Sequence, residues 1–207
     1  MVTRKNTPDA RNRILQAAVK IFAEKSFEGS RIEEIAKEAN VPKSLIYYHF
    51  KNKDEMFEVL VHDFIKEYTN IIKSQGSHSH KPNAEEMKNS LQNDYTEFIA
   101  KNTDLIRIIF IDSLKKSTDK PIIYKIVEAM IETEESNPQI SKSHNYNRDE
   151  RLIGEFFTGV VPLLSYLCFQ DSWINYFNMN KEECDTLFLK IMTTAHEAYH
   201  KQSSQNT

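Results

Sequence analysis

Residues 40–57 read NVPKSLIYYHFKNKDEMF, and the middle of this stretch predicts a short helix with two unlike faces. In a helix over about residues 42–50, Ile46 and Phe50 stand four residues apart, so one face can bury both. The side chains that turn partly or fully outward are Lys43, Ser44, Tyr47 and Tyr48. Such an exposed face of polar and aromatic groups suits a polar partner.

A second short helix is predicted just before the first, over about residues 31–39. Ser30 followed by Glu33 fits a capping box at its start. Asn40 then stands where a left-handed turn residue suits, and Pro42 suits a first helical position because its missing N–H would be unpaired there anyway. Two short helices joined by a turn of roughly three residues have the size and order of a helix-turn-helix, whose second helix enters the major groove of DNA.

The rest of the chain also has helical periodicity and no sustained alternation. Only 4 Gly and 6 Pro occur among 207 residues, which disfavours a loop-rich all-β fold. We expect an all-α fold with a three-helix helix-turn-helix head on a larger helical body. Its helices, about nine in number, are predicted over 8–25, 31–39, 42–50, 52–74, 84–101, 104–116, 120–134, 149–169 and 181–200. The predicted domains are a helix-turn-helix DNA-binding domain over 1–52 and a larger helical body over 53–207.

Three of these helices begin at recognisable N-cap residues. Thr7 precedes Pro8, while Asn52 and Asn180 are each followed three residues later by a glutamate. A side-chain oxygen at the N-cap accepts a hydrogen bond from the first turn of the helix. These residues therefore predict where the first, fourth and last helices begin.

The net charge of −3 is unevenly distributed along the chain. Residues 1–54 hold 11 Lys and Arg against 7 Asp and Glu, a net charge of +4, and the rest holds 16 against 23, a net charge of −7. A basic first quarter suggests a polyanionic partner for this end. The first residues lack an apolar signal-peptide core, and the most apolar run, 156–169, is shorter than a membrane span. We expect a cytoplasmic protein without a membrane partner, in which Cys168 and Cys184 are buried, reduced thiols.

The predicted DNA contacts follow from the position of each side chain in the helix-turn-helix. Lys43 and Ser44 lie in the first turn of the reading helix and can reach base edges, with Tyr47 one turn further on the same side. Hydroxyl, imidazole and ammonium groups flanking the groove can bind phosphate oxygens, and so can the free N–H groups at the start of the preceding helix. The predicted DNA-binding set is Ser30, Arg31, Pro42, Lys43, Ser44, Tyr47, Tyr48, His49 and Lys53.

These residues also carry a family resemblance. SRIEEIA at 30–36, ANV at 39–41 and LIYYHFKNK at 45–53 together resemble the head of TetR-like repressors, over about residues 8–57. The resemblance implies that Lys43, Ser44 and Tyr47 face bases. It implies that the DNA backbone is met by Ser30, Arg31, Tyr48, His49 and Lys53.

Three residues depart from the usual pattern of that family. Asn40 and Ser26 stand where glycine is usual, at the turn and at the end of the first helix. Leu45 stands where threonine is frequent, which removes a hydroxyl that could bind phosphate. The operator sequence therefore cannot be carried over from a relative.

The resemblance further implies a ligand-responsive repressor that binds a palindromic operator as a homodimer and is released by a small-molecule effector. By this resemblance, residues 53–207 would be an effector-binding and dimerisation domain. The subunits would pair through the helices at about 149–169 and 181–200. An effector pocket would lie in the body, where the sequence offers eight aromatic candidates, although ordinary core packing also explains each one. They are Phe64, Tyr68, Tyr95, Phe98, Phe110, Phe157, Tyr166 and Trp173. Arg107 and Asp112, in an otherwise apolar helix, could pair, cap or touch a ligand.

Two other functions fit parts of the sequence. HEAYH at 196–200 matches the HExxH pattern, in which two histidines on one helical face bind zinc and Glu197 acts as general base. This motif lies close to the end of the chain and on a helix suited to dimerisation, so we expect no enzyme activity, metal or cofactor. The second alternative is a constitutive DNA-binding protein without a ligand, for which a body of this size is larger than needed.

Overall fold

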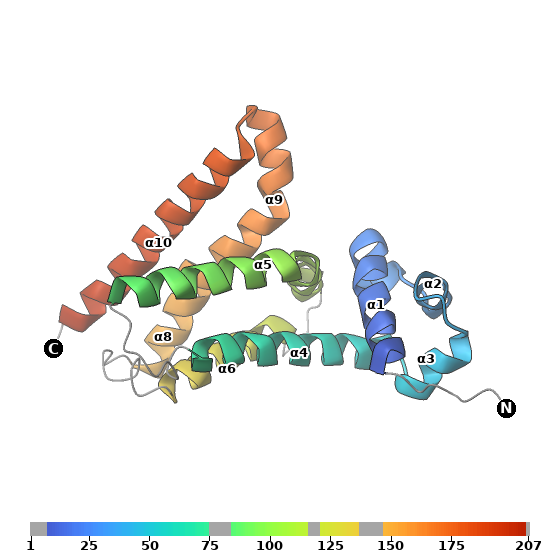
Figure 1. Cartoon of the computed structure of the whole chain (residues 1–207). Helices are drawn as coiled ribbons and strands as arrows, with labels where there is room; N and C mark the ends of the chain where they lie inside the picture. Colours follow the sequence, from blue (N-terminus) through green and yellow to red (C-terminus); the bar gives the residue numbers. More distant parts are fainter. Residues whose placement is uncertain (1–7, 75–83, 116–120, 137–146, 206–207) are drawn as a thin grey trace. The chain divides into compact units, whose positions relative to one another are not determined.

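The computed structural model describes residues 8–74, 84–115, 121–136 and 147–205, and every regular element in these ranges is helical (Figure 1). The all-α prediction is confirmed. The predicted N-cap Thr7 lies outside the described residues. The elements are α1 (Pro8–Gly29), α2 (Ile32–Glu38), α3 (Lys43–His49), α4 (Lys53–Ser74), α5 (Ala84–Lys115), α6 (Ile122–Glu135), α8 (Arg148–Gly154), the π-helix η1 (Glu155–Val160), α9 (Val161–Phe177) and α10 (Lys181–Gln205).

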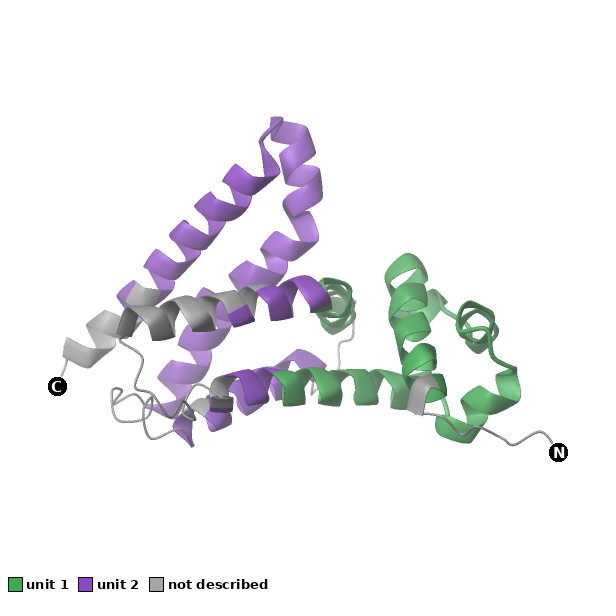
Figure 2. Ribbon diagram, viewed as in Figure 1, with its two compact units in different colours: residues 1–67, 102–115 green, residues 68–101, 116–207 purple. Residues whose placement is uncertain are grey.

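The chain divides into two compact units (Figure 2). Unit 1 contains the described part of Met1–Glu67 together with Asn102–Lys115, and unit 2 contains Tyr68–Lys101 and the described part of Lys116–Thr207. Unit 1 therefore holds more than α1, α2 and α3, because it includes most of α4 and the C-terminal part of α5. The functional division at residues 52 and 53 stays a prediction.

Three phenylalanines form the centre of unit 1. The ring centroids of Phe22 and Phe27, both from α1, lie 5.2 Å apart, and Phe57 of α4 lies 6.4 Å from Phe22 and 5.2 Å from Phe27. All three rings are buried, and each buried ring of this size stabilises the fold by roughly 1.5–3 kcal/mol. This cluster joins the end of α1 to the start of α4, so it supports the position of the short helices between them.

The last turn of α1 contains a strained residue. Ser26 has φ 65° and ψ 161° within the span Pro8–Gly29, which marks a kink after the predicted end of the helix near Lys25. Glycine adopts this conformation readily, whereas a side chain there costs roughly 1–3 kcal/mol. The Ser26 hydroxyl accepts a hydrogen bond from the main-chain N–H of Gly29 at 3.3 Å. This explains why glycine is usual at this position in the resembled family. Ser26 adopts the same conformation only with strain.

Two predicted helix boundaries were wrong. The expected break at residues 102–103 is absent, because α5 runs unbroken over Ala84–Lys115. The helix predicted over 149–169 continues through η1 to Phe177, where Asn178 adopts a left-handed conformation and ends it. The π-turn lies just before Pro162, which has no N–H to donate to the preceding turn.

The continuous helix Arg148–Phe177 is longer than its most apolar run suggested. By length and hydropathy it could cross a membrane, with a mean hydropathy of 1.7 over an 18-residue window, of which 22% is buried. The core helix of a water-soluble protein can pass the same test, so the finding alone does not place the helix in a bilayer. The low burial shows that much of its apolar surface is open within one copy of the chain. The large exposed apolar side chains of this helix and α10 are Ile153, Phe157, Phe169, Trp173, Tyr176, Phe177, Leu187 and Ile191.

Candidate nucleic-acid interface

The turn between α2 and α3 has the geometry expected of a helix-turn-helix. Asn40 has φ 52°, the left-handed conformation predicted for it. The main-chain N–H of Val41 donates to the carbonyl of Ala36 at 3.0 Å, which closes the end of α2. Pro42 has φ −65° and ψ 144° and serves as the N-cap of α3, so the helix begins at Lys43, one residue later than predicted. The chain therefore reverses tightly and presents α3 to solvent.

The short helix α3 buries one side and exposes the other. Ile46 is completely buried, and Phe50 directly after the helix is almost so. Tyr47 is 51% exposed and Tyr48 is 67% exposed. Lys43 and Ser44 are exposed as well. This arrangement leaves hydroxyl and ammonium groups on a protruding helix, where they can reach the edges of bases.

The ammonium of Lys43 is held by two neighbours. It forms an ion pair and hydrogen bond with the carboxylate of Glu33 in the first turn of α2. It also lies 5.6 Å from the ring centroid of Tyr47. The hydrogen bond between the pair raises the pKa of Lys43 and lowers the pKa of Glu33. Both groups are therefore charged over the whole range of ordinary pH.

Two residues of the predicted DNA-binding set serve the interior instead. Ser30 is 3% exposed and its hydroxyl donates to the carbonyl of Phe27 at 2.7 Å. The N-cap of α2 is Arg31, whose N–H donates to Glu34 at 3.1 Å, so the capping box of Ser30 with Glu33 was wrong. The Ser30 hydroxyl is therefore engaged within the head, and a phosphate contact through the main-chain N–H groups at the start of α2 stays a prediction.

Lys53 is the second residue with an internal role. Its ammonium donates to the carbonyls of Phe27 at 2.7 Å, Ser30 at 2.8 Å and Glu28 at 3.3 Å, and lies 4.9 Å from the Phe27 ring centroid. These carbonyls are the unsatisfied acceptors at the end of α1. The ammonium expected at a phosphate thus serves as a cap of α1, with its donors directed inward.

The rest of the predicted set is divided between surface and interior. Arg31 and Pro42 are exposed beside the reading helix. His49 is half-buried at the end of α3, with its ring against Tyr48 at 5.0 Å and Phe50 at 6.2 Å. Its Nε2 atom is buried and has no hydrogen-bond partner among the described residues. A phosphate contact of His49 therefore stays a prediction that requires the ring to move.

Four of the eight aromatic effector candidates are buried or half-buried in the core. Tyr68 and Phe98 lie in unit 2, with ring centroids 6.2 Å apart. Phe64, which is buried, and Phe110, which is half-buried, lie in unit 1. The side chain of Tyr95 lies outside the described residues.

The other three candidates lie on the late helices. Phe157 and Trp173 are more than half exposed. Tyr166 donates to the carboxylate of Asp185 at 2.6 Å and stacks on Phe188 with centroids 3.9 Å apart. An effector role for the eight aromatic residues stays a prediction.

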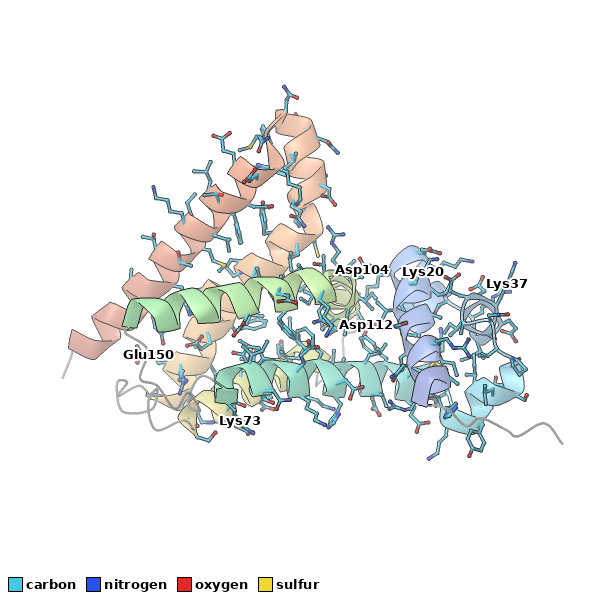
Figure 3. All side chains as sticks on the ribbon, viewed as in Figure 1. Lys20, Lys37, Lys73, Asp104, Asp112 and Glu150 are labelled. Atoms are coloured by element: carbon cyan, nitrogen blue, oxygen red, sulfur yellow. The ribbon has the colours of Figure 1, made fainter. Side chains whose placement is uncertain are left out.

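A cavity of about 290 Å³ lies inside unit 1, between the end of α1 and residues 102–115 of α5. On α1 it is lined by Phe22, Ser26 and neighbouring residues. Asp104 and Asp112, labelled in Figure 3, belong to the α5 wall. That wall consists of Asp104, Arg107, Ile108, Ile111, Asp112 and Lys115. Arg107 and Asp112, whose role the sequence left open, thus face the same cavity.

The HEAYH segment contributes a polar contact between helices. His196 of α10 accepts or donates a hydrogen bond to the Thr158 hydroxyl at 2.8 Å, and its Nε2 lies 3.5 Å from the buried carboxylate of Glu155. The side chains of Glu197 and His200 lie outside the described residues. Among those described, no group of three or more His, Cys, Asp or Glu side chains is placed to hold a metal ion. His196 therefore has a packing role that does not require zinc.

Comparison with known proteins identifies the family to which the head belongs. Residues 14–60 match the family model described as bacterial regulatory proteins, tetR family. The chain carries a TetR-family head. The matched segment includes α2, the turn and α3, and so confirms the resemblance seen in the sequence.

Curated relatives of this TetR-like chain are regulators that match over part of its length. YttP of Bacillus subtilis strain 168 is 29% identical over 100 residues, which cover 48% of each chain. IcaR of Staphylococcus aureus strain Newman, the negative transcriptional regulator of the biofilm operon icaADBC, is 34% identical over 62 residues, which cover 30% of this chain and 33% of IcaR. The matched part thus spans about half the length of YttP and a third of IcaR.

Solved structures share the TetR-like fold over nearly the whole chain. FadR of Bacillus subtilis, solved in complex with stearoyl-CoA, has a TM-score of 0.60 at 18% identity and covers 91% of this chain and 96% of its own. The fatty acid degradation regulator FadR of Bacillus halodurans has a TM-score of 0.58 at 20% identity and covers 95% and 97%. At these identities the likeness establishes the fold of the body but not its ligand.

Proposed function

We propose that the protein is a TetR-like transcriptional repressor, which binds a palindromic DNA operator as a homodimer and releases it when a small-molecule effector binds. One observation carries the proposal: α3 buries Ile46 and presents Lys43, Ser44 and Tyr47 outward, within a head that matches the TetR family model. Repression is supported by the description of IcaR as a negative regulator. The proposed site of action is the cytoplasm, and we propose no catalytic activity.

The homodimer is proposed from the open apolar face of the late helices. Phe157, Trp173 and Ile191 are each more than half exposed in one copy of the chain. Several large apolar side chains left open on the same pair of helices support an interface, because soluble proteins rarely leave extensive apolar surface uncovered. Two-fold pairing would cover the same face on both copies and hold two α3 helices roughly one DNA turn, 34–36 Å, or a multiple of it apart.

The effector response is proposed as a population shift. A ligand can change operator affinity only if it binds the two conformations of the protein unequally, and a difference of about 1–3 kcal/mol weakens DNA binding by roughly 5–150-fold. The cavity between α1 and α5 lies against the helix that braces the head, so filling it would act on the kink at Ser26. The stearoyl-CoA bound to the FadR structure makes long-chain acyl-CoA the first effector class to screen.

The test begins with DNA selection. The full-length protein would select duplexes from a random double-stranded library, and fluorescence anisotropy would then compare selected and scrambled duplexes, together with DNA from upstream of the protein's own gene. We expect selective binding that falls roughly tenfold or more in Tyr47→Ala, because Tyr47 faces the bases. Tyr124→Ala is the matched control, since Tyr124 is also 51% exposed but lies on α6. Absence of any selected sequence, even at low salt, would refute the proposal.

Effector release would be measured on the same selected duplex. Stearoyl-CoA, coenzyme A and stearate would be titrated separately into the preformed complex. Displacement by one of them identifies an effector class. Tight ligand binding that leaves operator affinity unchanged in every case would contradict the population shift and favour constitutive DNA binding.

A further inference from the structure

The three carboxylates of α2 make three ion pairs, and one of these pairs involves the reading helix. Glu34 pairs with Lys25 at 2.5 Å. Glu38 pairs with Lys20, labelled on α1 in Figure 3, at 2.6 Å. Glu33 pairs with Lys43 at the first position of α3. The first two pairs join α2 to α1, whereas the third crosses the helix-turn-helix.

The third pair places a negative charge on the surface proposed to meet DNA. Side chains of Glu33 and Lys43 are 61% and 46% exposed, so the pair is open to a ligand. An ammonium has three N–H donors, and Glu33 uses one of them. The other donors remain beside the ring of Tyr47. Lys43 can therefore donate to a base while it stays paired with Glu33.

We propose that Glu33 is a positioning residue for sequence recognition, which aims the ammonium of Lys43 at a base edge and keeps it from the phosphates. This inference rests on the proposed DNA-binding function. Lysine is a flexible point charge that by itself binds any phosphate within reach. A carboxylate that fixes one of its N–H groups restricts the directions of the other two. Lys43 then contributes to discrimination between bases and little to sequence-independent binding.

Replacing Glu33 with glutamine leaves a side chain of the same shape but removes the charge that holds Lys43. The freed ammonium gains access to phosphate oxygens in any DNA sequence. We expect Glu33→Gln to bind scrambled duplex several-fold more tightly, because each new phosphate contact strengthens non-specific binding. The slope of log affinity against log salt should become steeper by about one. Discrimination at the base read by Lys43 should fall roughly three- to tenfold.

Anisotropy titrations of the selected duplex and its single-base variants would test the inference at several salt concentrations. Lys43→Ala first identifies the base position at which Lys43 contributes to discrimination. Glu33→Gln is then measured in the wild-type background and in the Lys43→Ala background. The change in discrimination at that position should vanish in the second background, because the proposed role acts through Lys43.

Glu38→Gln is the matched control, since it removes one charge from the same helix and breaks an exposed pair of similar geometry. We expect it to change the salt slope and base discrimination by less than half as much as Glu33→Gln. Equal effects of the two variants would overturn the inference, because they would reflect net charge alone.

Three further outcomes have definite meanings. If Lys43→Ala leaves discrimination intact at every position, Lys43 reads no base and the inference is wrong. If the wild type binds the selected duplex selectively while Glu33→Gln keeps its base discrimination and salt slope, the positioning role is wrong but the proposed function stands. If the wild type selects no sequence at all, the proposed function itself fails.

Discussion

The ammonium of Lys53 donates a hydrogen bond to the main-chain carbonyl of Phe27 at 2.7 Å, although the two residues are 26 positions apart in the sequence. This contact fastens the first residue of α4 to the end of α1. Since α2 and α3 lie between these two helices in the chain, the contact closes the head around them. Its loss should therefore be visible in stability before it is visible in DNA binding.

Lys53→Met should lower the free energy of unfolding by about 2 kcal/mol, because a charged donor to several main-chain carbonyls is lost while the aliphatic stem is kept. Urea denaturation at fixed protein concentration would measure the change. Lys51→Met is the control, since Lys51 is exposed and its side chain should contribute less than about 0.5 kcal/mol. If Lys53→Met keeps full stability and instead flattens the salt dependence of DNA binding, Lys53 is a phosphate contact as the sequence predicted.

Ser26→Gly should raise the free energy of unfolding by about 1 kcal/mol, because glycine adopts φ 65° without the strain of a side chain. Part of the gain is offset by loss of the hydrogen bond between Gly29 and the Ser26 hydroxyl. The same denaturation experiment applies. The control is Ala23→Gly, three residues earlier in the helical part of α1. This variant should lower the free energy of unfolding by about 1 kcal/mol. A loss of stability in both variants would show that Ser26 is not strained.

Glu155→Gln should change how stability depends on pH. Burial raises the pKa of the Glu155 carboxyl above its ordinary value of 4.5, and nearby Arg151 opposes this to a smaller extent. The folded state therefore binds a proton that the unfolded state has released. The resulting stabilisation is present in acid and is lost as pH rises from about 4.5 through the raised pKa.

Glu155→Gln should accordingly be more stable than wild type near pH 7 and nearly equal to it near pH 4. Thermal denaturation across this pH range would measure the difference. Glu150→Gln, which removes a carboxylate from the exposed part of α8, serves as the control. A wild-type advantage that grows toward pH 7 would mean that ionised Glu155 is stabilised, by His196 or Arg151.

Phe157→Glu should weaken pairing of two copies by at least about thirtyfold, because it places a charge within the proposed apolar interface. Analytical ultracentrifugation would follow the mass, which is 24.2 kDa for one copy. Leu114→Glu is the control, since Leu114 is even more exposed but lies at the end of α5 in unit 1. A wild type that sediments as one copy at micromolar concentration would contradict the proposed homodimer.

Local sequence signals predicted the fold well where the structure depends on neighbouring residues. The left-handed turn at Asn40 was correct because asparagine tolerates positive φ. The caps at Asn52 and Asn180 were correct too, with side-chain oxygens accepting from the N–H groups of Glu55 at 2.8 Å and Glu183 at 3.1 Å. Each of these features is decided within four residues of the chain.

Contacts between distant residues could not be predicted. The sequence gives no sign that the Lys53 ammonium donates to the carbonyls at the end of α1, and its contact with phosphate stays a prediction. Ser30 looks like an N-cap until the hydroxyl is seen to donate to Phe27. The aromatic effector candidates could not be sorted either, since periodicity predicts burial and not whether a cavity lies beside a ring. The ion pair of Glu33 with Lys43 could not be predicted from the sequence, because a glutamate on a short exposed helix is common and indicates no particular partner.

The apolar helix Arg148–Phe177 has a consequence for the newly made chain. Until its open face is covered, a single copy presents a segment that satisfies the length and hydropathy criteria of a membrane-inserted helix. In the proposed homodimer, rapid encounter with a second copy would cover that segment and so protect it from degradation. The amount of protein in a cell should therefore fall more steeply than its rate of synthesis when synthesis is reduced.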